Sequence, residues 1–323
     1  MRSGVTSPLP LTKKSRCRRH WLVIAWLALA TCVLPPDAGA QPPPGNFSEL
    51  QGRLLGQDAN INRFRQRGPF AVTEQPGREL RLSAKERIPA DFYLASPGEK
   101  APLVIFLHGH DCSKEAHSRQ AMHLASWGIH AVSLQLAKTG PWDVNARTLA
   151  RIVNLIRRTP AVIDNRIDVN RIILVGHSFG GHAVALAMAQ GAPVAGGILL
   201  DPAYSGNATP EFLYKIKKPV MVLGADEIIN PVRRREYFYD YIQSNVVEVS
   251  IKDATHEDAQ YPSETSLQNG GVDAETTEEL QVTFVSGITA AAISLSTTGR
   301  LDYAWAGLRE MVDSGKMFNP KKK

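Results

Sequence analysis

Short apolar segments alternate with amphipathic segments along most of the chain, and this alternation restricts the possible folds more than any other feature. Residues 103–107 and 172–175 are continuously apolar, which is typical of strands buried on both faces of a parallel sheet. Residues 144–158 instead repeat apolar positions at the spacing of an amphipathic helix. Such alternation predicts one α/β domain, with a mostly parallel sheet covered by helices on both faces.

These patterns also predict where the elements lie. We expect strands at residues 88–94, 103–107, 129–134, 171–175, 197–200, 220–223 and 246–251, the last of these being the final strand. We expect helices at residues 114–127, 144–158, 179–190, 276–296 and 301–314, and one more within residues 46–68.

The turn at residues 176–181, between a predicted strand and a predicted helix, reads Gly-His-Ser-Phe-Gly-Gly. A serine at the apex of so tight a turn has strained backbone angles, and the glycines on either side let the backbones approach. The turn exposes the Ser178 hydroxyl and directs the free N–H groups of the helix toward the reacting centre. A Gly-x-Ser-x-Gly turn in this context is the nucleophile motif of the α/β-hydrolase fold, so Ser178 is the predicted nucleophile.

The apolar strand at residues 103–107 ends in His108-Gly109-His110. In this fold, a backbone N–H from that loop lies opposite the N–H of the residue after the nucleophile. The N–H groups of His110 and Phe179 are therefore the predicted oxyanion hole. The histidines near this loop match no known spacing of metal ligands, and we expect neither a metal nor another cofactor.

The general base is predicted from chain order, because this fold places its catalytic residues in the order serine, acid, histidine. Only His182 and His256 follow Ser178 among the histidines. His182 lies about one helical turn beyond the serine in the same helix, which leaves His256 as the base that accepts the Ser178 proton.

The acid stays open on the residues alone, because two strand ends carry carboxylates. Asp201 follows the strand at 197–200, whereas Asp226 and Glu227 follow the strand at 220–223. Either strand end can supply a carboxylate to the base.

Several segments resemble the secreted platelet-activating-factor acetylhydrolases. They are residues 102–134 with the His-Gly pair, residues 167–181 ending in Gly-His-Ser-Phe-Gly-Gly, the strand at 197–201 and the loop with Thr255-His256. The resemblance covers about residues 100–260. In that family the acid ends the strand just after the nucleophile helix, which ranks Asp201 first, Asp226 second and Glu227 third.

The chain is also similar to bacterial dienelactone-hydrolase-like enzymes and cutinase-like polyester hydrolases. In those enzymes the later strand end supplies the acid, which would be Asp226 or Glu227 here. The chain lacks the C-terminal cysteine pair of many cutinase-like enzymes. Both resemblances imply acyl-transfer chemistry and leave the substrate open.

The N-terminus has the organisation of a secretory signal peptide. Basic residues precede an apolar run at residues 21–34, which is too short for a comfortable membrane span, and a small-x-small site ends at Ala40. Cleavage there predicts an exported periplasmic or extracellular protein with no stable membrane span. Arg18-Arg19 also fits twin-arginine export, and lipid anchoring at Cys32 is a minor alternative.

The leader implies a division of the chain into three parts. They are a signal peptide at residues 1–40, a linker and extension at residues 41–69, and a catalytic domain at residues 70–323. Residues 1–40 hold six of the 37 Lys and Arg but one of the 31 Asp and Glu, so the remainder carries a net charge of +1. So balanced a charge gives no reason to expect a nucleic-acid partner. The run Arg233-Arg234-Arg235 is interpreted first as a solvated helix face, with attraction of an anionic substrate or a membrane surface as the alternative.

Residues 202–218 are all that separates the strand ending at Asp201 from the next strand, and they are too few for a large cap domain. An uncapped site is open to bulky or polymeric esters, and Tyr204, Trp142 and Phe179 are candidates to line it. The sequence therefore predicts an exported serine hydrolase that cleaves carboxylic esters, short-chain or polyester-like, through an acyl-enzyme. The alternatives are an amidase or peptidase with the same triad, and a catalytically silent binding protein on this scaffold.

Overall fold

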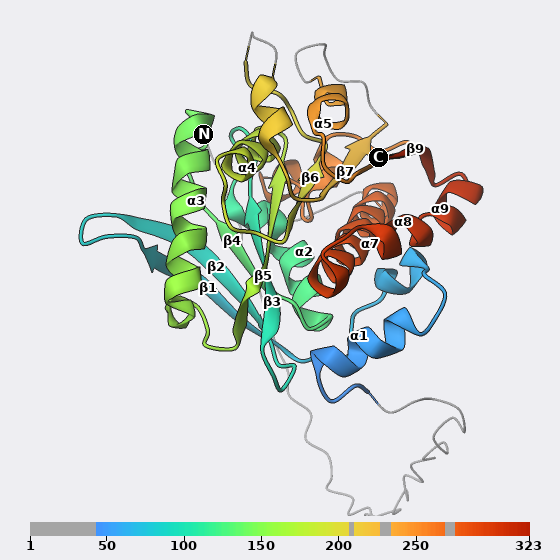
Figure 1. Ribbon diagram of the computed structural model, residues 1–323, viewed down its shortest axis with the longest axis horizontal. Coiled ribbons are helices and arrows are strands. Elements are labelled where there is room, and N and C mark those ends of the chain that lie inside the picture. Colours follow the sequence, from blue (N-terminus) through green and yellow to red (C-terminus); the bar gives the residue numbers. More distant parts are fainter. Residues whose placement is uncertain (1–42, 207–209, 227–233, 269–274) are drawn as a thin grey trace, which may run out of the picture. The chain divides into compact units, whose positions relative to one another are not determined.

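A mixed β-sheet in the order β1-β2-β4-β3-β5-β6-β7-β8-β9 forms the centre of the computed structural model (Figure 1). The structure describes residues 43–206, 210–226, 234–268 and 275–323. The strands are β1 (Val72–Arg81), β2 (Arg87–Ala95), β3 (Ala101–Leu107), β4 (His130–Leu134), β5 (Ile167–His177), β6 (Gly196–Leu200), β7 (Val220–Ala225), β8 (Val246–Ile251) and β9 (Met317–Lys322).

The central strands β4, β3, β5, β6, β7 and β8 run parallel, which confirms the predicted mostly parallel sheet. β1 pairs antiparallel with β2, β2 with β4, and β9 with β8. The prediction that residues 246–251 form the final strand is wrong, because β9 adds an edge strand beyond them. Most residues of β1 and β9 are exposed or half-buried, so neither edge strand has the apolar run that marks a central strand.

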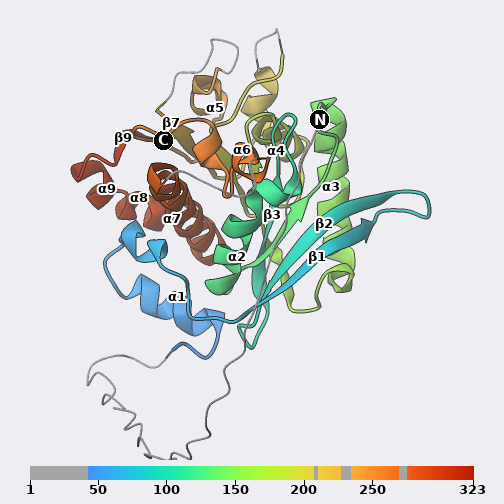
Figure 2. The ribbon, with the colours of Figure 1, turned by 180° about the vertical axis from the view of Figure 1, so that it is seen from behind.

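Helices cover both faces of the sheet, as Figures 1 and 2 show from opposite sides. One face packs against α1 (Phe47–Leu55), α2 (Ser118–Ser126), α7 (Glu275–Thr298), α8 (Asp302–Gly307) and α9 (Arg309–Asp313). The other face packs against α3 (Trp142–Arg158), α4 (Phe179–Ala189) and α5 (Glu236–Tyr241). The short helices are α6 (Glu264–Gln268) and the 3₁₀ helices η1 (Ile61–Arg65), η2 (Lys114–His117), η3 (Pro160–Val162), η4 (Glu211–Lys215) and η5 (Glu257–Ala259).

The segment at residues 46–68 forms α1 and η1 rather than one helix. The Asn46 side chain accepts a hydrogen bond from the Glu49 backbone N–H and so caps α1. Phe47 and Phe64 are fully buried in the same core cluster as α2 and α7. This segment therefore contributes to the core of the domain.

α7 is long and apolar enough to cross a membrane by length and composition alone. Of its apolar window, however, 83% is buried inside the fold. Residues such as Phe284 and Ile288 pack in the core cluster that includes α1 and the sheet. The helix has the character of a core helix in this structure.

Candidate active site

Ser178 lies at the apex of the turn from β5 to α4, with backbone angles φ 54° and ψ −126°. The two glycines that flank it permit close backbone contacts. A Cβ on Gly176 would lie 2.4 Å from the Gly180 carbonyl oxygen, and a Cβ on Gly180 would lie 2.3 Å from the His108 carbonyl oxygen. Real Cβ atoms do not approach other atoms so closely, so this turn requires glycine at both positions.

Backbone hydrogen bonds hold the turn against the end of β6. The Ser178 N–H donates to the Leu200 carbonyl at 3.0 Å, and the Ser178 carbonyl accepts from the N–H groups of Gly181 and Ala203 at 2.9 and 3.0 Å. The hydroxyl is not needed for any of these bonds. A strained serine conformation is thus maintained by the surrounding backbone.

Ser178 is more recessed than the turn alone predicts, since only 6% of it is exposed. The loop after β3 packs directly on it, because a Cβ on Gly109 would lie 2.9 Å from the Ser178 Cβ. This contact brings the predicted oxyanion loop, which ends at His110, to the nucleophile turn.

His256 and Asp201 lie together in the structure. The distance from His256 Nδ1 to Asp201 Oδ2 is 2.5 Å, and both side chains are buried. Asp201 directly follows β6, and His256 follows β8 at the start of η5. Their pairing joins the turns after two strands at the same end of the sheet as the Ser178 turn.

Asp201 is held as a carboxylate. Burial alone would raise its pKa, but the hydrogen bond with His256, the charge of His256 and the guanidinium of Arg235 outweigh burial, so its pKa is lowered. An ionised Asp201 accepts the hydrogen bond of His256 Nδ1–H, so in the neutral imidazole the proton lies on Nδ1 and Nε2 is the acceptor. That tautomer is the one a general base needs.

Asp226, the second candidate acid, is not brought to His256 in the described structure. Asp226 follows β7, and its Oδ2 accepts the backbone N–H of Asp253 at 2.9 Å. Its own N–H donates to the Ala254 carbonyl at 3.0 Å. Asp226 therefore stabilises the turn after β8, and Glu227 lies outside the described residues.

His177 and Gln260 support the His256 loop, and sequence reasoning missed both roles. The His177 ring centroid lies 4.4 Å from that of His256, and its Nε2 lies 3.1 Å from the His256 carbonyl oxygen. Gln260 Nε2 lies 3.1 Å from His177 Nδ1. The amide donates to Nδ1, so His177 is neutral and its Nε2–H donates to the His256 carbonyl. No sequence signal identifies a loop glutamine that contacts a residue 83 positions away.

The predicted oxyanion donors lie on the two segments that meet at Ser178. In the described part of the chain, the backbone N–H of His110 donates to no group. The backbone N–H of Phe179 donates to none apart from the hydrogen bonds within helix α4 itself. The Phe179 ring stacks on Trp142 at a centroid distance of 5.6 Å and lies 6.1 Å from the His110 ring. Tyr204, the other predicted lining residue, packs instead on His182, a turn farther along α4.

Cys112, two residues beyond His110, is expected to react slowly in the folded protein. Its thiol donates to the His110 carbonyl at 3.2 Å, and its sulfur accepts a hydrogen bond from Gln260 Nε2 at 3.6 Å. Burial, followed by the negative charges of Glu257 and Glu264, raises the pKa of Cys112 to about 12. The reactive thiolate forms only near and above that pH, so at pH 8 the thiol is almost wholly protonated.

The test uses the protein without residues 1–40, in which Cys112 is the single cysteine. Reaction with a chromogenic disulfide at pH 8 should be about 10³-fold slower in the folded protein than in guanidinium chloride. Equal rates in the two states would show that Cys112 is exposed and ionisable, contrary to this geometry.

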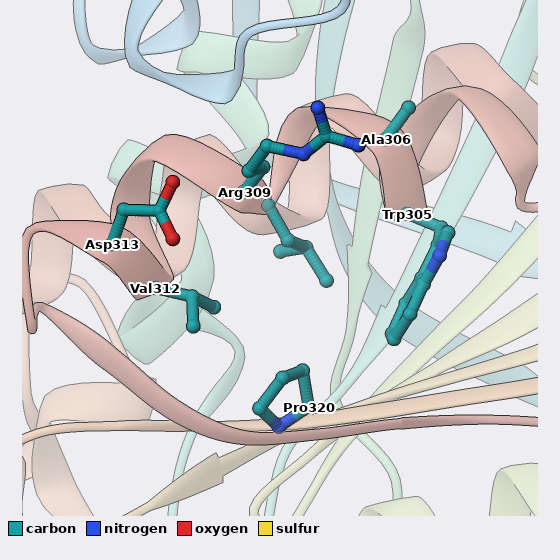
Figure 3. Close-up of a pocket in the computed structure, with 7 residues that line it drawn as sticks. Trp305, Ala306, Arg309, Val312, Asp313 and Pro320 are labelled. Carbon is teal, nitrogen blue, oxygen red and sulfur yellow. The ribbon is translucent and has the colours of Figure 1, made fainter.

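No group of three or more His, Cys, Asp or Glu side chains that could hold a metal ion occurs among the described residues. A pocket of about 300 Å³ lies between α8, α9 and β9 (Figure 3). Trp305, Val312 and Pro320 form its apolar walls, with Arg309 and Asp313 beside them. Its lining contains no nucleophilic side chain and no member of the Ser178, Asp201 and His256 group.

Comparison with known proteins places this chain in a family. Residues 104–310, more than half of the chain, match the model of the Alpha/beta hydrolase family. This match confirms the resemblance to the α/β-hydrolase superfamily.

Three curated relatives show the same likeness. Cutinase est1 of Thermobifida alba is 26% identical over 195 residues, which cover 58% of this chain and 64% of that protein. Cutinase 1 of Thermobifida cellulosilytica is 25% identical over 58% of this chain and 72% of its own length. A putative non-heme haloperoxidase of Mycobacterium phage D29 is 33% identical over 34% of this chain and 39% of its own length. The chain thus matches less than two thirds of the est1 and haloperoxidase sequences.

Proposed function

The chain belongs to the Alpha/beta hydrolase family, and from this premise we propose that it is an exported serine hydrolase that cleaves carboxylic esters through an acyl-enzyme. The observation that carries the proposal is the 2.5 Å contact between His256 Nδ1 and Asp201 Oδ2, beside a strained Ser178 turn. An accidental glycine-rich turn has no need of a buried His–Asp pair next to it.

In the proposed mechanism His256 Nε2 takes the Ser178 proton as the hydroxyl oxygen attacks the ester carbonyl. The N–H groups of His110 and Phe179 stabilise the oxyanion, and each such donor contributes about 3 kcal/mol to transition-state stabilisation. The protonated His256, held by Asp201, then gives its proton to the leaving alcohol. Water attacks the acyl-enzyme in the same way and releases the acid.

Three observations support an ester with a bulky acyl or alcohol part. Two of the relatives named above are called cutinases. The described part of residues 202–218 contains one short helix, η4, in place of a cap domain. Phe179, the residue that follows the nucleophile, is partly exposed and stacks on the buried Trp142, so its ring can contact a substrate. Small-molecule or polymeric esters are therefore the proposed substrates.

Export is proposed from the sequence alone, because residues 1–42 lie outside the described structure. The basic residues, the apolar run at 21–34 and the site ending at Ala40 support a cleaved leader. The rest of the chain is proposed as the extension and catalytic domain of the mature protein, with lipid anchoring at Cys32 as the lesser possibility.

The substrate class is tested with p-nitrophenyl esters from acetate to palmitate, beside the matching p-nitroanilides. We expect the protein without residues 1–40 to turn over the esters and to show no measurable turnover of the anilides. Because p-nitrophenolate leaves more readily than p-nitroaniline, an amidase would also cleave these esters, so Ser178-dependent turnover of the anilides is the result that would favour an amidase. Turnover of neither, together with no labelling by a fluorophosphonate, would favour a silent binding protein.

A further inference from the structure

Arg235, which directly precedes α5, extends its guanidinium inward to Asp201. Its Nη1 donates to Asp201 Oδ1 at 2.7 Å and to the Ala225 carbonyl at 2.7 Å, and its Nη2 donates to Ser250 Oγ at 2.9 Å. The backbone N–H of Ala225 donates to the same Asp201 Oδ1 at 3.1 Å. Both carboxylate oxygens of Asp201 are therefore hydrogen-bonded: Oδ2 to His256, and Oδ1 to the Arg235 guanidinium and the Ala225 backbone N–H.

The path of this side chain depends on Gly224 in β7. A Cβ on Gly224 would lie 2.1 Å from Arg235 Nη1 and 2.3 Å from its Cζ. A glycine inside a buried strand often marks the close approach of another group, and here that group is the guanidinium. The interpretation of the arginine run as a solvated face is thus wrong for Arg235. Arg234 is exposed and lies over the Tyr237 ring, and Arg233 lies outside the described residues.

Among the described residues, Asp201 is the nearer of two anionic partners of Arg235. Glu248 Oε1 on β8 lies 3.7 Å from Arg235 Nε, compared with 2.7 Å from Nη1 to Asp201. Burial raises the pKa of Glu248, which the charges of Lys321 and Arg235 offset in part. Among the described residues, His177 on β5 contacts His256, and Arg235 pairs with Asp201. Glu248 on β8 lies beside Arg235, and Lys321 on β9 pairs with Glu248.

We propose that Arg235 is a positioning residue that fixes the orientation of Asp201 toward His256 and lowers the pH at which activity is lost in acid. The proposal rests on the proposed function. A guanidinium fork binds a carboxylate oxygen with defined geometry, so it limits rotation of the Asp201 side chain. Its positive charge helps to keep Asp201 ionised, in line with the lowered pKa of that carboxyl. The acid limb of kcat/KM reports proton uptake by the groups that the free enzyme needs in their unprotonated forms, so we expect this limb to move to higher pH when the Arg235 charge is lost.

The main test compares Arg235→Met with Arg234→Met in protein expressed from the full-length chain. Met keeps much of the apolar stem of Arg235 and removes its charge and donors. We expect kcat to fall by up to about 100-fold through misplacement of Asp201. We expect the acid limb of kcat/KM to move up by about one pH unit, because a nearby positive charge is lost. Arg234→Met, the matched control, should leave both unchanged.

Two further variants separate the effect of the Arg235 charge from that of its hydrogen-bond geometry. They also keep the proposal testable if Arg235→Met does not fold. Arg235→Lys keeps the charge without the fork, so the acid limb should stay near its wild-type position while kcat remains lowered. Ser250→Ala removes one acceptor of the guanidinium and keeps its charge, so it should lower kcat without moving the limb. Circular dichroism and thermal unfolding check that each variant is folded.

A folded Arg235→Met protein with wild-type kcat and acid limb would overturn this proposal alone. The same holds if the Lys and Met variants shift the limb equally, since charge would then play no part. A wild-type protein without Ser178-dependent turnover would overturn the proposed function, and this proposal with it.

Discussion

Ser178→Ala is expected to abolish ester hydrolysis and to leave the fold intact. In a serine protease, loss of the nucleophile lowers kcat by about 10⁶-fold, because no acyl-enzyme can form and only binding and the oxyanion hole remain. The fold should be unaffected, because the turn is held by the Ser178 backbone N–H and carbonyl and its side chain makes no helix-cap hydrogen bond. Removal of the hydroxyl should therefore abolish catalysis and change the free energy of unfolding little.

The comparison requires kcat on p-nitrophenyl acetate together with a thermal unfolding curve for each protein. The variant should unfold within a few degrees of wild type while its turnover falls to the uncatalysed background. Turnover near the wild-type rate in a folded Ser178→Ala protein would remove Ser178 from the mechanism.

Asp201→Asn is the second change with a very large expected effect. The equivalent Asp to Asn change in a serine protease costs about 10⁴-fold in kcat, because the histidine adopts the wrong tautomer. Here Arg235 favours the same outcome. The guanidinium requires an acceptor, so the new amide should turn its oxygen to Arg235 and its NH₂ group to His256 Nδ1. His256 then carries its proton on Nε2 and cannot accept the one from Ser178.

Asp226→Asn is the matched control for this change. Its side-chain oxygen can still accept the Asp253 N–H, so the turn after β8 should survive and kcat should change little. The two variants are compared by kcat on one ester at one pH, with unfolding curves to exclude loss of fold. If Asp226→Asn lost far more activity than Asp201→Asn, the acid would belong to the end of β7.

Features with a strong local cause could be predicted from the sequence. The apolar run of β3 favours a buried strand, the glycines around Ser178 favour a tight turn, and the structure contains both. The catalytic acid could not be predicted in this way, because carboxylates follow two neighbouring strands and the residues alone do not choose between them. Only a family resemblance ranked Asp201 first. The contact with His256 depends on how the loops after β6 and β8 meet, and neither loop encodes that by itself.

Other features were hidden because their cause lies elsewhere in the chain. β9 contains Asn319, Pro320 and lysines, and it is a strand only because β8 offers it an edge. Arg235 stands in a run of charges that usually faces solvent, and its inward path follows from Gly224 on another element. That glycine in an apolar strand was the one sequence signal of the contact.

The most direct test of the central claim is to label the protein with a fluorophosphonate and to locate the adduct by peptide mass spectrometry. If Ser178 is the activated nucleophile, the wild-type protein should gain about one phosphonyl group, on the peptide that contains Ser178, as turnover is lost. Ser178→Ala should gain none, and Asp201→Asn should react far more slowly. An active wild-type protein that is not labelled, or that is labelled equally in Ser178→Ala, would contradict the account.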